Sequence, residues 1–170
     1  MLEDIRKVLI SREQIRARVG QLGEMISHDY KGSDLVVVGV LNGGVVFAAD
    51  LVREITIPLT LDFISVSSYG KSTESTGIVR ILKDLDTDIR NRNVLIVEDL
   101  IDTGLTRGPC EIKVCALLDK ISRRKVDVTI EYRGFEIPDE FVVGYGLDFA
   151  GKYRNLPGIC VLKPSVYKRQ

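Results

Sequence analysis

The sequence predicts an α/β domain with a largely parallel sheet flanked by helices. Two observations support this fold class. Residues 34–40 (DLVVVGV) and 94–97 (VLIV) are continuous apolar runs, which are typical of strands buried on both faces. Helical patterns alternate with these runs along the chain, as in folds whose parallel strands are joined by helices. A length of 170 residues fits a single domain that can bury about 70% of its unfolded surface.

The expected elements begin with a helix from Ser11 to about Tyr30. Ser11 and Gln14 match a capping box, and apolar residues then recur at helical spacing, at Ile15, Val19, Leu22 and Ile26. Residues 42–44 (NGG) predict a turn, and the largely apolar stretch 45–54 predicts a buried helix. Besides 34–40, strands are expected at 59–66, 78–82, 94–97, 111–118, 141–143 and 159–162.

Charge and cysteine content exclude several classes of protein. Lys and Arg together number 24, as do Asp and Glu, so the net charge is zero and we expect no nucleic-acid or membrane partner. The three cysteines lack C-x-x-C spacing, which argues against a disulfide framework or a thiolate zinc site. We also find no secretory signal and no apolar run of about 18 residues. A cytoplasmic protein is therefore expected.

The most informative segment is residues 94–106 (VLIVEDLIDTGLT), where a buried strand ends in carboxylates. Because unpaired carboxylates beside a core are costly, Glu98, Asp99 and Asp102 indicate a partner, such as ligand hydroxyls, a metal ion or a lysine. Residues 103–106 (TGLT) offer hydroxyls and backbone N–H groups in a tight turn, which suits a phosphate. Alternatively, the carboxylates cap a helix and the threonines are ordinary turn residues. The segment as a whole favours the phosphate site.

This segment resembles the phosphoribosyl-pyrophosphate motif of the type I phosphoribosyltransferases, in the form found in the hypoxanthine-guanine phosphoribosyltransferases. Walker A and dinucleotide-binding patterns do not occur in the sequence. Further stretches resemble the family in the right order, at 41–44, 67–77, 116–120 and 134–154. The resemblance implies the type I phosphoribosyltransferase fold over residues 1–170, with a core at about 34–140. A small hood is then expected from about 1–12 and 141–170.

The resemblance also implies a reaction. The family's enzymes of this form transfer 5-phosphoribosyl from phosphoribosyl pyrophosphate to hypoxanthine or guanine, which gives IMP or GMP and pyrophosphate in purine salvage. The expected cofactor is Mg²⁺, and the expected partners are the purine base and phosphoribosyl pyrophosphate. Because family members are usually dimers or tetramers, a homodimer or homotetramer is expected.

The resemblance gives each residue of the phosphate segment a role. Glu98 and Asp99 would hold the ribose hydroxyls, directly or through Mg²⁺, which suits carboxylates because they accept hydrogen bonds and bind hard cations. Asp102 would manage the proton on purine N7, and burial that raises its pKa would help this role. The 5′-phosphate would be held by Thr103, Gly104 and Thr106.

Residues near the C-terminus and after the strand at 111–118 would bind the purine and the pyrophosphate. Lys120 would donate to purine O6, which favours 6-oxopurines over adenine. Phe141 would stack on the ring, and Val142 would offer backbone atoms to its edge. Asp148 would reach Mg²⁺, and the forked guanidinium of Arg154 would pair with pyrophosphate oxygens. Taken without the resemblance, a lone lysine is usually a surface residue and an aromatic in an apolar strand is usually core.

Two loops complete the implied site. The family's pyrophosphate-binding loop corresponds to Leu41, Asn42 and Gly43, and a non-proline cis peptide is expected there. Asn42 departs from the family, in which most members carry lysine, so weaker pyrophosphate binding is expected. The Ser-, Thr- and Gly-rich stretch 67–77 corresponds to a catalytic loop, in which Ser68 and Tyr69 would close over the phosphates and exclude water.

A second departure lies after Thr106, where the family continues into a helix. Here residues 107–109 (RGP) follow at once, and too few residues remain for a crossover between parallel strands, which takes a dozen or more. Either this helix has been lost, or residues of the natural chain are absent from the sequence. A true loss would remove a helix N-terminus from the 5′-phosphate and cover from one sheet face. We then expect lowered stability and activity.

The main alternative is a regulator that senses phosphoribosyl pyrophosphate. A purine repressor would need an additional DNA-binding domain, for which 170 residues leave no room. An RNA attenuation regulator with uracil phosphoribosyltransferase activity would be expected to show a basic face and an Asp-Asp pair in place of Glu98-Asp99. Zero net charge and the stretch 140–142 (EFV) favour the purine enzyme. The sequence does not rank hypoxanthine, guanine and xanthine.

Overall fold

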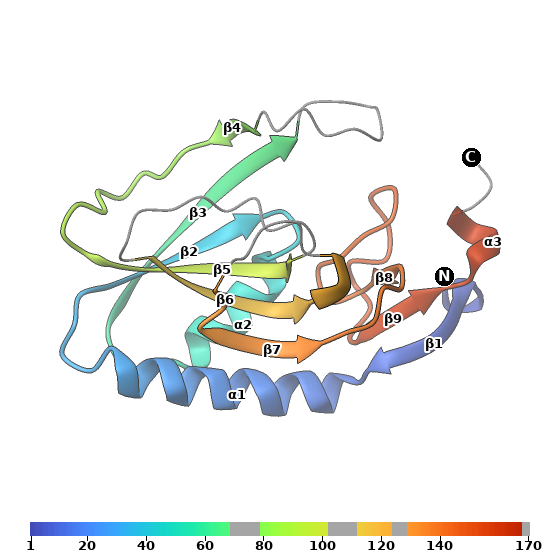
Figure 1. The fold of residues 1–170 in the computed structure, drawn as a ribbon, viewed down its shortest axis with the longest axis horizontal. Helices are drawn as coiled ribbons and strands as arrows, with labels where there is room; N and C mark the ends of the chain where they lie inside the picture. The colour runs from blue at the N-terminus through green and yellow to red at the C-terminus, as the bar shows by residue number, and fades with distance from the viewer. Residues whose placement is uncertain (69–78, 102–111, 124–128, 168–170) are drawn as a thin grey trace.

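The computed structural model describes residues 1–68, 79–101, 112–123 and 129–167 (Figure 1). Among these residues the central sheet has the order β4-β3-β2-β5-β6-β7. Its strands are β2 (Leu35–Leu41), β3 (Leu59–Ser68), β4 (Val79–Lys83), β5 (Asn93–Ile101), β6 (Ile112–Asp119) and β7 (Tyr132–Glu136). Neighbouring strands are parallel except β3 and β4, which are antiparallel. The predicted α/β class with a largely parallel sheet is confirmed.

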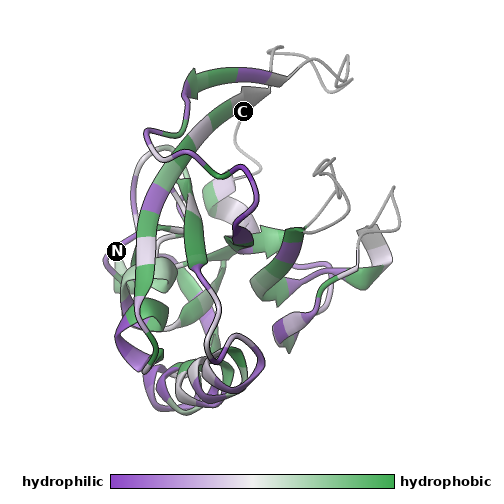
Figure 2. Ribbon diagram, turned by 90° about the vertical axis from the view of Figure 1, so that its left-hand side faces the viewer, coloured by the Kyte–Doolittle hydropathy of each residue, from purple (hydrophilic) through white to green (hydrophobic). Residues whose placement is uncertain are grey.

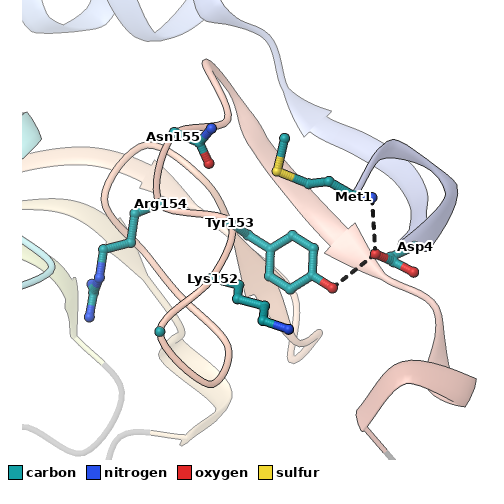
Figure 3. Close-up of a pocket in the computed structure, with 7 residues that line it drawn as sticks. Met1, Asp4, Lys152, Tyr153, Arg154 and Asn155 are labelled. Carbon is teal, nitrogen blue, oxygen red and sulfur yellow. Dashed lines mark hydrogen bonds and ion pairs between the residues drawn. The ribbon is translucent and has the colours of Figure 1, made fainter.

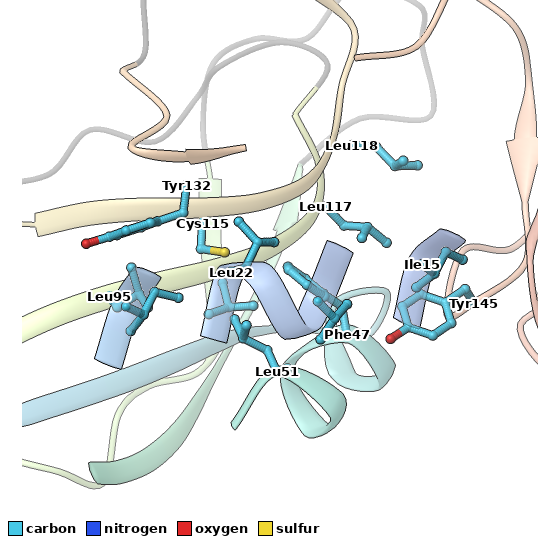
Figure 4. Close-up of a cluster of buried hydrophobic side chains, with 14 of the residues drawn as sticks. Ile15, Leu22, Phe47, Leu51, Leu95, Cys115, Leu117, Leu118, Tyr132 and Tyr145 are labelled. Atoms are coloured by element: carbon cyan, nitrogen blue, oxygen red, sulfur yellow. The ribbon is translucent and has the colours of Figure 1, made fainter. Parts of the chain in front are cut away.

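Helices α1 (Arg12–Asp29) and α2 (Val45–Glu54) cover one face of this sheet. The predicted capping box starts α1: Gln14 N donates to Ser11 Oγ (3.3 Å), and Ser11 N donates to Gln14 Oε1 (2.8 Å). In Figure 2 the turns of α1, seen end-on at the bottom, carry both hydrophobic and hydrophilic residues. Their apolar side packs inward, and Figure 4 shows Leu22 gathered with Phe47, Leu51 and Leu95 in one core.

The opposite face of the sheet has its own small cluster of buried side chains. Val36, Val38 and Val94 pack there against Leu85 and Ile89 from the connection between β4 and β5. Alternate residues of β2 thus enter different cores, since the side chains of a strand alternate between its faces. The continuous apolar run that predicted a strand buried on both faces is explained by these two clusters.

A second, antiparallel sheet with the order β1-β9-β8 stands at one end of the molecule, and we call this end the hood (Figure 1). Its strands are β1 (Ile5–Ile10), β8 (Val142–Val143) and β9 (Ile159–Leu162). The remaining described elements are η1 (Leu2–Asp4), η2 (Ile121–Arg123) and α3 (Pro164–Tyr167). Within the described residues, no helix is long and apolar enough to cross a bilayer.

The structure corrects the predicted elements at several points. β1, β7 and α3 were not predicted, because these segments are short and carry polar residues within them. The strand predicted at 94–97 extends to Ile101, so Glu98 and Asp99 lie inside β5 instead of following it. The reason is that β6 offers backbone partners as far as the pair Ile101 and Asp119. The predicted shortened connection after Thr106 lies outside the described residues.

Candidate active site

The carboxyl ends of the parallel strands meet at one edge of the central sheet, where ligands of such folds bind. Leu41 ends β2, and Glu98 and Asp99 lie near the end of β5. Lys120 directly follows β6, and its backbone N donates to Ile101 O (3.2 Å), which places Lys120 beside the end of β5. The topology therefore brings predicted residues from three strands to one edge.

The turn after β2 lies directly against the carboxylate of Asp99. The peptide bond between Leu41 and Asn42 is cis, as the family resemblance implied. A Cβ added to Gly43 would overlap the carboxylate group of Asp99, so any side chain at this position would displace Asp99. The predicted pyrophosphate loop and the predicted carboxylate pair are therefore in contact.

The hood reaches the same point through the loop after β8. Gly146 has a φ of +101°, and a Cβ added there would meet Gly43 O. Arg154 Nη1 donates to Gly146 O (2.5 Å), and Arg154 Nη2 lies 2.8 Å from Asp148 Oδ1. The predicted residues Asp148 and Arg154 are thus held next to the turn at Gly43. Gly146 itself was not predicted as a site residue, although its flanking G-Y-G pattern signals an unusual backbone.

Burial shifts the titration of the two adjacent carboxyls of β5. Burial, with a smaller contribution from the charge of Asp99, raises the pKa of Glu98 to about 8. Burial also raises the pKa of Asp99 to about 6, opposed by backbone N–H groups and by Arg154, and Asp148 raises it further. A cation brought to this edge would lower both pKa values, because it favours the ionised forms of the carboxyls.

The carboxylate pair fits the way Mg²⁺ is usually held in phosphate-binding enzymes. This ion commonly takes one or two carboxylates and fills its remaining positions with water and substrate phosphates. Among the described residues no group of three or more metal-ligating side chains is found, so a closed protein cage is not formed there. Asp148, also predicted as a ligand, accepts from Gly151 N (2.7 Å) and pairs with Arg154, so its metal role stays a prediction.

Lys120 is buried, with 5% of its surface exposed, which is unusual for a lysine. Its Nζ lies 4.0 Å from Asp139 Oδ1. A surface lysine would have been the ordinary expectation, so burial at the strand ends supports a binding role. Asp139 was not predicted as a site residue, since nothing in its local pattern distinguishes it from other loop acids.

Phe141 and Val142 lie at the start of the hood strand β8. Val142 is 6% exposed and pairs with Val161, whereas Phe141 keeps 38% of its surface exposed. The carbonyl of Phe141 accepts from Leu162 N (3.3 Å), so its backbone is fixed while its ring is partly open. An exposed aromatic ring on a fixed backbone is a suitable platform for a flat ligand.

The other six predicted site residues belong to β3 or to the segments that follow β3 and β5. Ser68 ends β3 with its backbone opposite Val79. The remaining ones lie outside the described residues, namely Tyr69, Asp102, Thr103, Gly104 and Thr106.

A cavity of about 460 Å³ lies between the N-terminal segment and the loop that carries Arg154 (Figure 3). Its lining residues are Met1, Asp4, Gly151, Lys152, Tyr153, Arg154 and Asn155. In Figure 3 the side chain of Arg154 points away from Met1 and Asp4, and Tyr153 donates from its hydroxyl to Asp4 Oδ2 (2.9 Å). Of the predicted site residues only Arg154 lines this cavity, so it is distinct from the edge that holds the carboxylate pair.

Comparison with known proteins agrees with this geometry. A family model described as the phosphoribosyl transferase domain matches residues 11–150. The chain belongs to the phosphoribosyltransferase family. Hypoxanthine-guanine phosphoribosyltransferase of Bacillus subtilis is 50% identical over 178 residues, covering 99% of this chain and 99% of the relative. Hypoxanthine phosphoribosyltransferase of Escherichia coli is 50% identical and covers 90% of this phosphoribosyltransferase and 93% of the relative.

Solved structures of relatives share the fold of this phosphoribosyltransferase. The crystal structure of a hypoxanthine phosphoribosyltransferase from Staphylococcus aureus matches with a TM-score of 0.93 and 46% identity, covering 98% of this chain and 96% of that chain. The fold class that the motifs implied is therefore confirmed. The alignment with the Bacillus subtilis relative spans 178 positions, which is more than the 170 residues of this chain. This chain therefore lacks several residues that the relative has.

Proposed function

We propose that this phosphoribosyltransferase transfers 5-phosphoribosyl from phosphoribosyl pyrophosphate to hypoxanthine or guanine, giving IMP or GMP and pyrophosphate in purine salvage. One observation carries the proposal. Glu98 and Asp99 lie at the carboxyl edge of the sheet, with the turn at Gly43 against Asp99, in a chain half-identical to relatives named for this activity. The hydroxyls of a ribose and the charge of a diphosphate match this combination.

The carboxylate pair and Arg154 would bind phosphoribosyl pyrophosphate. Glu98 and Asp99 accept from the ribose hydroxyls or hold Mg²⁺, which when bound neutralises the charge of the departing pyrophosphate. Asp148 fixes the guanidinium of Arg154 (2.8 Å) so that its fork can pair with pyrophosphate oxygens. The backbone of Asn42 and Gly43 contributes uncharged donors in place of the lysine side chain common in the family.

The purine would lie between the end of β6 and the hood. Lys120 donates to O6 of a 6-oxopurine, whereas the amino group of adenine would place a donor against a donor. The partly exposed ring of Phe141 stacks on the base, and the backbone of Val142 bonds its edge. Hypoxanthine and guanine share the O6 acceptor, so this part of the site accepts both.

The remaining roles are assigned by the family motifs. Asp102 exchanges the proton on purine N7, and Ser68 and Tyr69 close over the phosphates to exclude water. Thr103, Gly104 and Thr106 hold the 5′-phosphate. We also propose a cytoplasmic homodimer or homotetramer.

The uracil-using RNA attenuation regulator is not supported. The relatives that match over nearly the whole chain are named hypoxanthine or hypoxanthine-guanine phosphoribosyltransferases.

A steady-state assay with four bases tests the proposed function. The enzyme is supplied with phosphoribosyl pyrophosphate and Mg²⁺, and hypoxanthine, guanine, xanthine and uracil are compared at equal concentration. We expect turnover of hypoxanthine or guanine with release of one pyrophosphate per nucleotide. Turnover of uracil alone, or of no base, would contradict the proposal.

The variant Asp102→Asn is a second test. It should lower kcat about 10-fold or more, which is the range that general acid–base catalysis supplies.

A further inference from the structure

The ring of Phe141 is already in contact with two aromatic side chains. The ring of Tyr167, from the C-terminal helix α3, stacks nearly parallel to it at 5.0 Å between centroids and 20° between planes. Phe149 meets Phe141 edge-on, at 5.5 Å and 88°. Even so, 38% of the surface of Phe141 stays exposed. One face of the ring is therefore stacked on Tyr167, while more than a third of the surface of the residue stays open.

α3 is anchored firmly enough to act as a support. Lys163 N, just before α3, donates to Asp4 O (2.8 Å), which ties the helix to the N-terminal segment. Val166 and Tyr167 also pack against the second hydrophobic cluster, which is centred on Val143 and Leu162 of the hood strands. In Figure 1 α3 lies next to the N-terminus at the outer end of the hood. The C-terminal helix is thus an integral part of the hood.

The residue before Phe141 is fixed as well. Glu140 Oε1 accepts from Arg6 Nη2 (2.7 Å) and from Lys7 Nζ (3.1 Å), both on β1. The backbone at Phe141 is thereby held by β1 and by Leu162 of β9, but neither contact sets the angle of the ring. The two ring contacts act on the ring itself, and the parallel stack on Tyr167 is the closer of the two between centroids, at 5.0 Å against 5.5 Å.

We propose that Tyr167 is a positioning residue for purine binding: it stacks on one face of Phe141 and so orients the opposite face for the base, in a stack of Tyr167, Phe141 and purine. The proposal rests on the function proposed above, because it assigns the open face of Phe141 to the purine. A supported ring loses less side-chain freedom when the base binds, so removal of Tyr167 weakens purine binding specifically. Phosphoribosyl pyrophosphate binds elsewhere and is unaffected.

Steady-state kinetics of Tyr167→Ala, Tyr167→Phe and the matched control Val166→Ala test this role. Tyr167→Ala should raise KM for hypoxanthine about 3- to 10-fold at saturating phosphoribosyl pyrophosphate, which is the range of one aromatic pair. KM for phosphoribosyl pyrophosphate and kcat should stay within about twofold. Tyr167→Phe keeps the ring and should restore the wild-type KM, whereas Val166→Ala loosens the same helix without touching the stack.

The outcomes separate this proposal from the proposed function. An inactive wild-type enzyme would reject the function itself. If the wild-type enzyme is active, two results for Tyr167→Ala would reject the positioning role alone: a KM for hypoxanthine equal to that of the wild type, or equal rises in KM for hypoxanthine and for phosphoribosyl pyrophosphate.

The chain has no tryptophan, so Tyr167→Trp provides a single fluorescent reporter in the stack. Acrylamide quenching should not increase when GMP and Mg²⁺ bind; an increase would mean that the ring leaves Phe141 and competes with the purine.

Discussion

Glu98 and Asp99 show, at the scale of single residues, how local physics serves a binding site. Burial raises both pKa values, with a further rise for Glu98 from the charge of Asp99 and for Asp99 from the charge of Asp148, so the free protein holds both carboxyls at a cost that a cation would relieve. The sequence predicted this pair from its position after an apolar run. It did not predict Gly146, Asp139 or Tyr167, because their importance arises from contacts between segments that are distant in the chain.

The raised pKa of Glu98 predicts a pH dependence of stability. The folded pKa of about 8 lies above the ordinary value of 4.5 for a glutamate carboxyl, so the folded state binds the proton more tightly than the unfolded chain. This contribution is complete below pH 4.5 and is lost as the pH rises through about 8. We therefore expect the Tm of the ligand-free protein to fall between pH 5 and pH 8.5, and to fall less in Glu98→Gln, which cannot ionise.

Calorimetry at both pH values measures this difference. Each 1 kcal/mol corresponds to about 2–4 °C for a protein of this size. Glu136→Gln, which removes an exposed carboxyl at the end of β7, serves as the control with the same change in charge and should follow the wild type. If Glu98→Gln loses as much Tm as the wild type, burial of Glu98 does not govern the alkaline loss.

At the scale of elements, the contact between α1 and α2 depends on a small residue. A Cβ added to Gly23 of α1 would collide with the backbone of Glu54 at the end of α2. The sequence predicted both helices and the capping box of α1, because these follow from local spacing. It could not predict where the helices approach each other, nor the strands β1 and β7, whose stability comes from pairing with distant partners.

Two glycine substitutions in α1 should therefore have opposite effects. Gly23→Ala should destabilise the protein by about 1–3 kcal/mol, since the added methyl group forces α1 away from α2. Gly20→Ala should stabilise it by about 0.5–1 kcal/mol, because its Cβ would have no neighbour nearer than 3.9 Å and alanine favours the helix. Urea denaturation measures both values. A Gly23→Ala variant as stable as Gly20→Ala would show that the helices do not meet there.

At the scale of the whole molecule, the hood and the central sheet meet where Gly146 touches the turn at Gly43. The motif order predicted the fold family and the sheet that positions the site, because the family resemblance covers nearly the whole chain. The chain is nevertheless shorter than its alignment with the Bacillus subtilis relative, which is consistent with the shortened connection predicted after Thr106.

Restoring the aligned segment of the Bacillus subtilis relative after Thr106 should raise the Tm and lower KM for phosphoribosyl pyrophosphate. A helix N-terminus near a phosphate is worth about 0.3–2 kcal/mol, which corresponds to a decrease in KM of about 2- to 30-fold. Intact mass is measured first and should be 19.0 kDa, since a heavier natural protein would already contain the segment. An insertion that changes neither Tm nor KM would argue that no helix is missing at this position.

The central claim is that the carboxyl edge of the sheet binds phosphoribosyl pyrophosphate through Glu98, Asp99 and Mg²⁺. Titration calorimetry with phosphoribosyl pyrophosphate, in Mg²⁺ and in EDTA, tests it directly on the wild type and on Asp99→Asn, with circular dichroism to verify folding. We predict binding at least about 10-fold tighter with Mg²⁺ in the wild type, and loss of most of this gain in Asp99→Asn. Equal affinity in Mg²⁺ and EDTA, or an Asp99→Asn variant that keeps the full Mg²⁺ effect, would contradict the account.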